Sequence, residues 1–312
     1  MSPPLRTLLQ SFRASTPGTF HASITQSWMQ GRTTFGGCSA ALCLEGAKRH
    51  LQDDALPLRS ALVSFVGPAG GNVDVKTTVL RRGKAKGKGM AFVRAEMFAA
   101  ESGELATSCQ FAFGADRLAS AFHSTMGVDD PPAALPGPDA SPSLFASSAA
   151  FPPPVFTQHF EARLAQGGAP GSGAEESDNF MWVRHKGVDY PSSSSSSSSS
   201  STTRGTDGGV PGVDDDVALL CLADMPPPAI VPRFTEAAPV SSCTWIVNFL
   251  ARPAPPASSG GWFLLRSKAE GAWGGYSSQD MAIYGAENTP IAVGRQCVAI
   301  FDKAPTQSQS RL

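Results

Sequence analysis

The sequence predicts an α+β protein built from two tandem copies of one unit, each with a single helix packed against a curved antiparallel sheet. A short motif recurs with a constant offset of 186 residues, as Ala100-Glu101, Ala106 and Gln110 and again as Ala286-Glu287, Ala292 and Gln296. Both halves also have the same order of segments, one apolar helical stripe followed by several strand-like runs. Because the stripe must be buried, a sheet wrapped around the helix satisfies both elements.

The periodicity of the first half predicts its elements in order. Alternating side chains predict a strand over 20–28, and an apolar stripe at helical spacing predicts a helix over 38–50. Further strands are predicted, each bounded by Gly, Pro or charged turn residues, at 58–65, 73–82, 90–99 and 105–113.

The second half repeats this order. Alternation predicts strands over 155–163 and 180–185, and an apolar run predicts a helix over 217–225 that the prolines at 226–228 must end. The remaining strands are predicted at 243–250, 262–269, 272–284 and 291–301.

These segments divide the chain into two units and their connections. The expected parts are an N-terminal unit (1–114), a Pro/Ala/Ser-rich linker (115–154), a C-terminal unit (155–304) and a flexible tail (305–312). The C-terminal unit contains an insertion at 186–216 that includes an uninterrupted serine run. Since this insertion lacks the apolar surface that would offset its ordering entropy, we expect it to be disordered.

Composition excludes several classes of protein. The 312 residues suffice for two cores, and a formal net charge of −1 gives no overall attraction to nucleic acid. The six cysteines form no CxxC pair and have no histidine at metal-ligand spacing, so we expect neither a metal site nor a disulfide framework. We also expect no membrane span, because no run of about 18 apolar residues occurs, and no secretory signal.

The C-terminal residues predict a location. Ser310-Arg311-Leu312 is a variant of the Ser-Lys-Leu peroxisomal address and follows a polar tail that would leave it accessible to an import receptor. We therefore expect a peroxisomal protein, with the cytoplasm as the alternative.

The order of motifs resembles the tandem hotdog acyl-CoA thioesterases, the type II acyl-CoA thioesterase and thioesterase-like superfamily. The resemblance covers most of the chain outside the linker and the insertion. In the first half, its motifs are Phe20–Ile24, Trp28, Phe35–Leu42, Phe65 with Pro68, and Val79–Gly83. In the second half, they are Leu219–Asp224 with the prolines behind it, Trp273-Gly274-Gly275, and Ala292–Gln296.

This resemblance implies a double hotdog fold and a set of site residues. The family pattern places an Asp on the second helix, a Ser or Thr on the following strand and a Gln on the last strand. These positions correspond to Asp224, Ser242 and Gln296, with Thr244 left open as the hydroxyl residue. The implied reaction is hydrolysis of a fatty acyl-CoA to free fatty acid and CoA by activated water, without metal, cofactor or covalent intermediate.

The residue types fit this chemistry on their own terms. A carboxylate after an apolar helix is costly unless it is paired or used, and Asp224 could deprotonate water. A buried amide at Gln296 needs partners, which a held water would supply. The structural alternatives are an exposed Asp224 in the last helical turn and a purely structural amide bond at Gln296. We expect Gln110 to be the structural counterpart of Gln296, because the first copy has Gly46 near the place of Asp224.

Two further features could contact the substrate. Gly36 and Gly37 open a helix, so their N–H groups could polarise a thioester carbonyl, or they could serve only a tight turn. The basic residues Arg81, Arg82 and Lys84 could bind the CoA phosphates, or they could form a solvated turn.

Other classes of function fit less well. The run Gly37–Ala41 faintly resembles a serine hydrolase elbow, but no histidine follows His185. A hotdog hydratase would need an Asp and a His close together on one helix, and this chain has no such pair. The main alternative is an inactive hotdog protein that binds acyl-CoA or acts as a scaffold. A homodimer of double hotdogs is compatible with either function.

Overall fold

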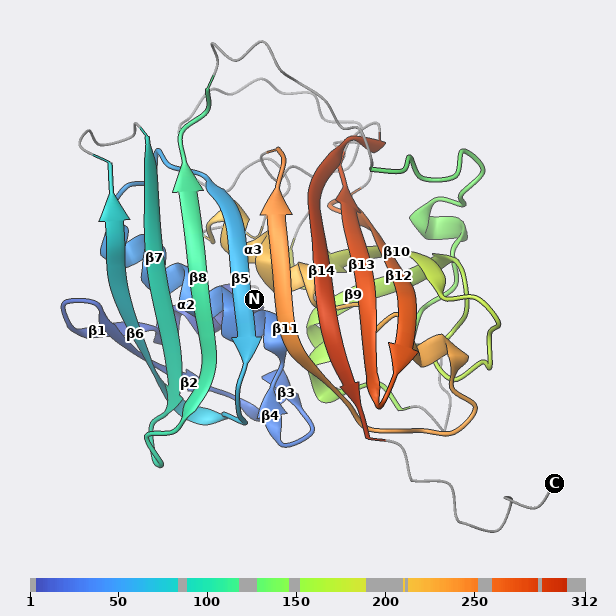
Figure 1. Ribbon diagram of the computed structural model, residues 1–312, viewed down its shortest axis with the longest axis horizontal. Helices are drawn as coiled ribbons and strands as arrows, with labels where there is room; N and C mark the ends of the chain where they lie inside the picture. Colours follow the sequence, from blue (N-terminus) through green and yellow to red (C-terminus); the bar gives the residue numbers. More distant parts are fainter. Residues whose placement is uncertain are drawn as a thin grey trace.

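The two halves of the chain form one continuous antiparallel sheet with helices on one face (Figure 1). The computed structural model describes residues 4–83, 89–117, 128–145, 152–188, 210, 213–251, 260–285 and 288–301. The sheet has 12 strands in the order β1-β2-β6-β7-β8-β5-β11-β14-β13-β12-β10-β9. In Figure 1 the helices α2 (Gly36–Leu51) and α3 (Asp215–Ala223) lie behind this sheet.

The first half contains most of the elements expected from periodicity. They are α1 (Pro4–Ser11), β1 (Arg13–Thr16), β2 (Thr19–Ile24), η1 (Gln26–Trp28), β3 (Met29–Gln30), β4 (Thr33–Thr34), α2, β5 (Leu58–Phe65), β6 (Gly71–Arg82), β7 (Met90–Ala99) and β8 (Leu105–Gly114). The predicted strand over 20–28 is wrong beyond Ile24, where the chain turns into the short helix η1 that buries Trp28. Helix α1 was not predicted, although its buried Leu5, Leu8 and Leu9 have helical spacing.

The second half also differs from expectation at several boundaries. Its elements are η2 (Pro138–Ala140), η3 (Val155–His159), β9 (Phe160–Gln166), β10 (Asp178–His185), α3, η4 (Val231–Arg233), β11 (Val240–Phe249), β12 (Phe263–Trp273), β13 (Tyr276–Tyr284) and β14 (Pro290–Ile300). The predicted strand over 155–163 is wrong in its first part, because η3 stacks Phe156 on Phe35 at 3.9 Å between ring centroids. Helix α3 starts at Asp215, since the Asp214 side chain accepts the Asp216 N–H at 3.1 Å and caps the helix. The strand predicted over 272–284 is wrong at its start, because Ala272 and Trp273 still belong to the preceding strand and pair with Ser277 and Tyr276 across the turn.

Strands β5 and β11 join the two halves. They pair antiparallel through Ser60–Ser64 and Thr244–Asn248 at the centre of the sheet. One hydrophobic cluster contains buried residues of both helices and both halves, so the two units share a core. The structure therefore confirms the predicted α+β double hotdog, a tandem of two helices wrapped by one sheet.

Parts of the expected linker and insertion are ordered against the second half. The carbonyl of Pro136 accepts the Trp182 Nε1–H at 2.9 Å, and the carbonyl of Asp129 accepts the Tyr284 hydroxyl at 2.8 Å. Asp214 is the N-cap of α3, and Asp215 and Asp216 lie in its first turn, so the expectation of disorder over 186–216 is wrong at this end. The serine run lies outside the described residues.

The expected equivalence of Gln110 and Gln296 is wrong by one residue. The Ala106 carbonyl accepts the Val66 and Gly67 N–H groups, and the Ile291 carbonyl accepts those of Leu250 and Ala251. Ala106 therefore corresponds to Ile291, an offset of 185 rather than 186. A shift of one residue turns a side chain to the other face of the sheet. Accordingly, Gln110 is exposed whereas Gln296 is buried.

An ion network connects the two helices at one end. Lys48 of α2 donates to Asp214 Oδ1 at 2.5 Å and to Asp216 Oδ2 at 2.6 Å. Asp216 Oδ2 also accepts the Leu58 N–H at 3.2 Å. Burial acts to lower the pKa of Lys48, but Asp216 and Asp214 outweigh it and the pKa is raised. The network therefore holds the end of α2, the start of α3 and the start of β5 together.

Removing the lysine should destabilise the fold. In Lys48→Met, Asp216 would keep only one N–H partner although its side chain is 9% exposed, so we expect the free energy of unfolding to fall by about 3 kcal/mol. Urea denaturation at pH 7 measures this change. The control Arg94→Met removes an exposed pair with Glu96 and should cost less than about 1 kcal/mol. Equal losses in the two variants would contradict the role of the network.

Candidate active site

Asp224 lies where the end of α3 meets the start of α2. It directly follows the last helical residue, Ala223, and precedes Met225 and three prolines. A Cβ on Gly36 would lie 2.6 Å from Asp224 Oδ2, and one on Gly37 would lie 2.3 Å from the Cys221 carbonyl oxygen. Both distances are below any normal contact, so the two helix ends can approach this closely only because α2 begins with glycines.

The start of α2 provides a partner for the carboxylate. The backbone N–H of Gly37 acts on Asp224 and lowers the pKa of its carboxyl group. The first N–H groups of a helix have no partner within the helix and form its positive end, which favours a negative charge. In this structure Gly37 therefore favours the charged form of Asp224. The predicted contact of Gly36 and Gly37 with a thioester carbonyl stays a prediction.

Gln296 connects the carboxylate to a serine. Its Nε2 donates to Asp224 Oδ1 at 3.0 Å and to Ser242 Oγ at 2.8 Å. The structure thus brings together Asp224, Ser242 and Gln296 from α3, β11 and β14. The side chain of Gln296 is 6% exposed, so its amide requires these partners.

A β-bulge decides which hydroxyl faces Gln296. Ser242 pairs with Val298 and Thr244 pairs with Cys297, which leaves Cys243 as an extra residue in β11. Beyond the bulge, Trp245, Val247 and Phe249 are buried while Thr244 is exposed. Without the bulge, Ser242 would face away from Trp245. Of the two alternatives left by the sequence, Ser242 is the residue that contacts Gln296.

The orientation of Gln296 is set by a residue that the sequence did not indicate, Gln279. This buried side chain is the cross-strand neighbour of Gln296 and donates from Nε2 to Gln296 Oε1 at 2.8 Å. Its own Oε1 accepts the Ala229 N–H at 2.7 Å. A backbone N–H can only donate, so Gln279 must present oxygen to Ala229 and Gln296 must present Nε2 to Asp224 and Ser242. The alternation of β13 could have predicted a buried Gln279, but not this direction.

The environment makes Asp224 titrate near neutrality. Burial raises the pKa of Asp224 from 3.8 to about 7, against the lowering effects of the Gln296 hydrogen bond and the Gly37 N–H. A carboxylate with this pKa can both accept and release a proton near pH 7. A strongly perturbed group beside hydrogen-bonding partners is typical of a functional site.

The predicted phosphate-binding residues do not lie at this cluster. Arg81 and Arg82 are exposed at the end of β6, and Arg82 Nη2 lies 3.7 Å from Asp53 Oδ2. Four strands separate β6 from β14, which corresponds to about 24 Å across the sheet. Lys84 lies outside the described residues. Contact of these three residues with CoA phosphates stays a prediction.

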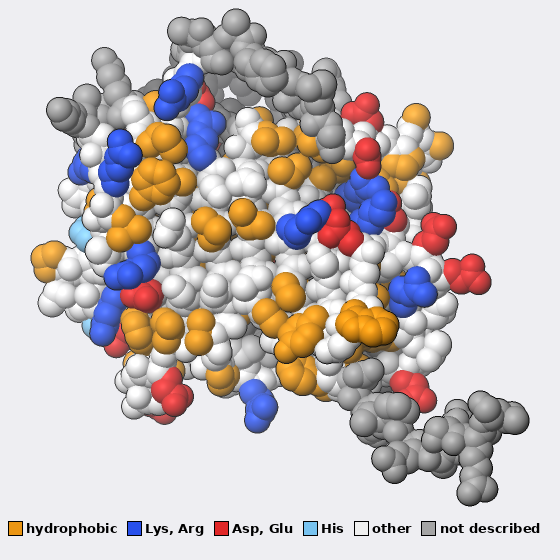
Figure 2. Space-filling model, viewed as in Figure 1, with side chains coloured by type: hydrophobic (Ala, Val, Ile, Leu, Met, Phe, Trp, Pro, Cys, Tyr) orange, Lys and Arg blue, Asp and Glu red, His pale blue; other side chains and the backbone are white. Residues whose placement is uncertain are grey.

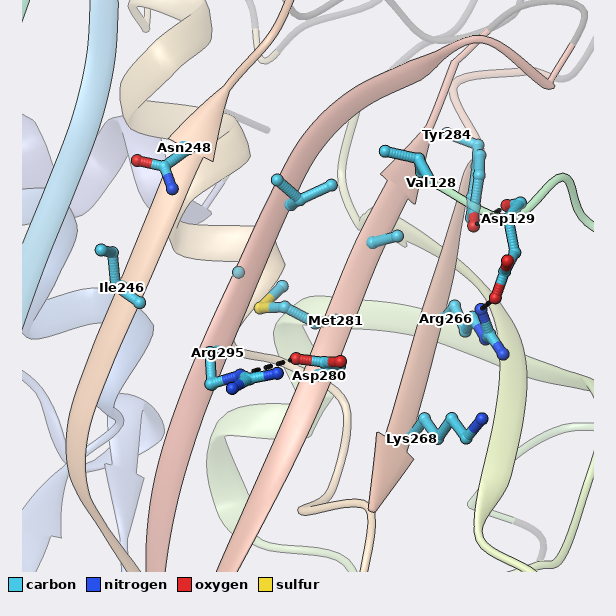
Figure 3. A pocket seen from close by; sticks show the side chains of 13 residues that line it. Val128, Asp129, Ile246, Asn248, Arg266, Lys268, Asp280, Met281, Tyr284 and Arg295 are labelled. Atoms are coloured by element: carbon cyan, nitrogen blue, oxygen red, sulfur yellow. Dashed lines mark hydrogen bonds and ion pairs between the residues drawn. The ribbon is translucent and has the colours of Figure 1, made fainter. Parts of the chain in front are cut away.

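A hollow on the outer face of the sheet is separate from the cluster. It has a volume of about 470 Å³ and is lined by Arg295 and Asp280 (Figure 3). The neighbouring Gln296 is buried and bonds to Asp224. Its charged side chains are largely paired, Arg295 with Asp280 at 2.8 Å and Arg266 with Asp129 at 2.7 Å. In Figure 2 basic and acidic side chains lie next to one another over these strands.

Neither a cluster of metal ligands nor a membrane-spanning helix occurs in the part of the chain that the structure describes. No group of three or more His, Cys, Asp or Glu side chains there is placed to hold a metal ion. No helix within those ranges is long and apolar enough to cross a membrane.

Solved structures share the whole architecture. A conserved hot dog-fold protein from Alicyclobacillus acidocaldarius is 21% identical, with 94% of this chain and 96% of that chain covered and a TM-score of 0.70. An acyl-CoA thioesterase II from Mycobacterium marinum is 16% identical, with 97% and 100% covered and a TM-score of 0.64. At these identities the likeness establishes the class of protein, a double hotdog.

Family models identify the chain more closely. Residues 24–114 match the acyl-CoA thioesterase N-terminal domain, and residues 128–300 match the acyl-CoA thioesterase C-terminal domain. The chain therefore belongs to the acyl-CoA thioesterase family, a family of thioester hydrolases, as the resemblance predicted. No curated protein matches it significantly by sequence.

The raised pKa predicts a pH-dependent cost to stability. Ionised Asp224 is disfavoured in the folded state, so the cost begins above pH 3.8 and is complete above about pH 7. We expect Asp224→Asn to raise the free energy of unfolding at pH 8 by up to about 4 kcal/mol, with a gain that vanishes below pH 4. Urea denaturation across this range measures it. A gain that did not change with pH would contradict the assigned titration.

Proposed function

We propose that this protein hydrolyses a fatty acyl-CoA to the free fatty acid and CoA, using a water molecule activated by Asp224. The observation that supports this most directly is the shared donor: one amide nitrogen of Gln296 contacts both Asp224 and Ser242. Membership of a thioesterase family supports the same substrate class. Acyl chain length is not implied by these contacts.

The reaction requires the charged form of Asp224. In the proposed step, the carboxylate takes a proton from a water held beside Gln296 and Ser242, and the oxygen attacks the thioester carbonyl. The tetrahedral oxyanion would be stabilised by N–H groups at the start of α2, around Gly36 and Gly37. The C–S bond then breaks, and the proton on Asp224 passes to the departing CoA thiolate.

The pKa of Asp224 suits both halves of this cycle. Below about pH 7 the carboxyl is protonated and cannot accept the proton of water. Above that pH it is ionised, yet its conjugate acid is still strong enough to protonate a thiolate. An ordinary carboxylate with a pKa near 4 would be a much weaker base.

The proposal predicts a loss of hydrolysis in Asp224→Asn. We expect kcat for thiol release from a panel of acyl-CoAs to fall by about 100-fold or more, because the general base is removed. In the wild type, kcat/KM should rise with pH through about pH 7. Asp280→Asn, which changes a carboxylate on the outer face, serves as the matched control and should leave the rate unchanged.

The outcomes separate the two candidate functions. Equal rates of thiol release for wild type and Asp224→Asn would contradict the assignment of Asp224 as the general base. A wild type that binds acyl-CoA in calorimetry but releases no thiol would instead support the inactive binding protein.

The direction of the Gln296 amide can be tested through Gln279. In Gln279→Glu, a carboxylate would replace the donor next to Gln296 Oε1, so the Gln296 amide should turn its Nε2 toward Glu and its oxygen toward Asp224. We expect kcat to fall by about tenfold or more and the acid limb of the pH profile to move upward, because Asp224 loses a donor that lowers its pKa. A change in stability alone would not move this limb.

Gln110→Glu is the control for this variant. It makes the same chemical change on an exposed side chain of the other half. The pH profile of its activity should match that of the wild type. If the acid limb were unshifted in Gln279→Glu as well, the positioning role of Gln279 would be contradicted.

A further inference from the structure

Two cysteines are the immediate sequence neighbours of candidate catalytic residues. Cys243 follows Ser242 in β11, and Cys297 follows Gln296 in β14. Gln296 is buried against the helices, whereas Cys243 and Cys297 are both partly exposed. Each thiol is therefore joined by one peptide bond to a residue of the Asp224 cluster.

The β-bulge places these two cysteines opposite each other on neighbouring strands. Ser242 pairs with Val298 and Thr244 with Cys297, so the extra residue Cys243 stands opposite Cys297. Burial raises the pKa of Cys243, and the neighbouring Cys297 raises it further. The facing position of the two thiols is thus a consequence of the same bulge that turns Ser242 toward Gln296.

The remaining cysteines provide an internal comparison. Cys38, Cys43, Cys109 and Cys221 are between 0% and 2% exposed. Cys43 and Cys109 also contact each other, but they do so inside the shared core. An oxidant in solution can therefore reach Cys243 and Cys297, whereas Cys43 and Cys109 are shielded from it.

We propose that Cys243 and Cys297 are a site of reversible oxidation, which closes to an intramolecular disulfide when the protein meets a hydroperoxide. The thiolate of Cys297 attacks the peroxide and breaks the O–O bond, giving a sulfenic acid and water or an alcohol. The second thiol attacks the sulfenic sulfur and releases water. Two thiols are oxidised, the peroxide is reduced, and a dithiol reductant reverses the change.

The disulfide would disturb the site on the other side of the sheet, an effect that rests on the proposed function. A disulfide holds its sulfurs about 2.0 Å apart, much closer than two thiols in contact. Drawing them together moves β11 relative to β14 at the place where Ser242 accepts its 2.8 Å bond from Gln296. Since misplacement of catalytic groups by about 1 Å can cost about 100-fold in rate, the oxidised protein should be less active.

The experiment treats the reduced full chain with hydrogen peroxide, blocks remaining thiols, and maps peptides by mass spectrometry without reductant. We expect one linked species that joins the Cys243 and Cys297 peptides and is two hydrogens lighter than their sum. Cys43 and Cys109 should stay unlinked. Thiol release from acyl-CoA should fall by about tenfold or more and return after dithiothreitol treatment.

Single substitutions provide the controls. Cys243→Ser and Cys297→Ser should keep the activity of the reduced wild type and resist inactivation by peroxide. Only sulfinic acids or intermolecular links, without the linked peptide, would overturn the proposal. A linked peptide with unchanged activity would overturn the coupling to the site. If the reduced protein releases no thiol at all, the proposed function fails, while the peptide map still decides the disulfide.

Discussion

The site depends on the contact between the end of α3 and the start of α2. Because α2 opens with Gly36 and Gly37, the two helix ends meet without intervening side chains. Asp224 follows an apolar helix, and the backbone N–H of Gly37 in the partner helix lowers the pKa of its carboxyl group. The close contact lowers the cost of a buried carboxylate without removing it, which leaves a group that changes charge near neutral pH.

The opposite ends of the same two helices have the opposite chemistry. There, Lys48 pairs with both Asp214 and Asp216, and these carboxylates keep the pKa of the lysine raised despite its burial. The sequence placed Gly46 of the first copy near the position of Asp224 in the second, but the two residues do not occupy equivalent positions. Gly46 is buried inside α2 against Val75, and the helix continues to Leu51, whereas Asp224 follows the end of α3. The end of α2 and the start of α3 are joined by a structural ion network, whereas the end of α3 and the start of α2 form the candidate site.

The polarity of the site comes from a chain of amides. It begins at the Ala229 N–H and passes through Gln279 and Gln296 to Asp224 and Ser242. Each step allows one orientation because the first donor cannot accept. Buried networks of this kind are effective only when every member is satisfied, and this one connects β13, β14, β11 and the end of α3.

The sequence by itself determined the duplicated α+β plan, most strand positions, the candidates Asp224 and Gln296, and a hydroxyl residue at Ser242 or Thr244, because apolar periodicity and family motifs are local properties of the chain. It could not determine which glutamine faces the helices. The Ala-x3-Gln repeat suggested that Gln110 and Gln296 are equivalent, but strand register depends on pairing with β5 and β11, and one residue reverses the face. Only the tertiary structure decided between Ser242 and Thr244, introduced Gln279, and placed two thiols behind the site. Each of these depends on which residues of separate strands lie opposite one another, and that is set by the β-bulge and the sheet order rather than by any local pattern.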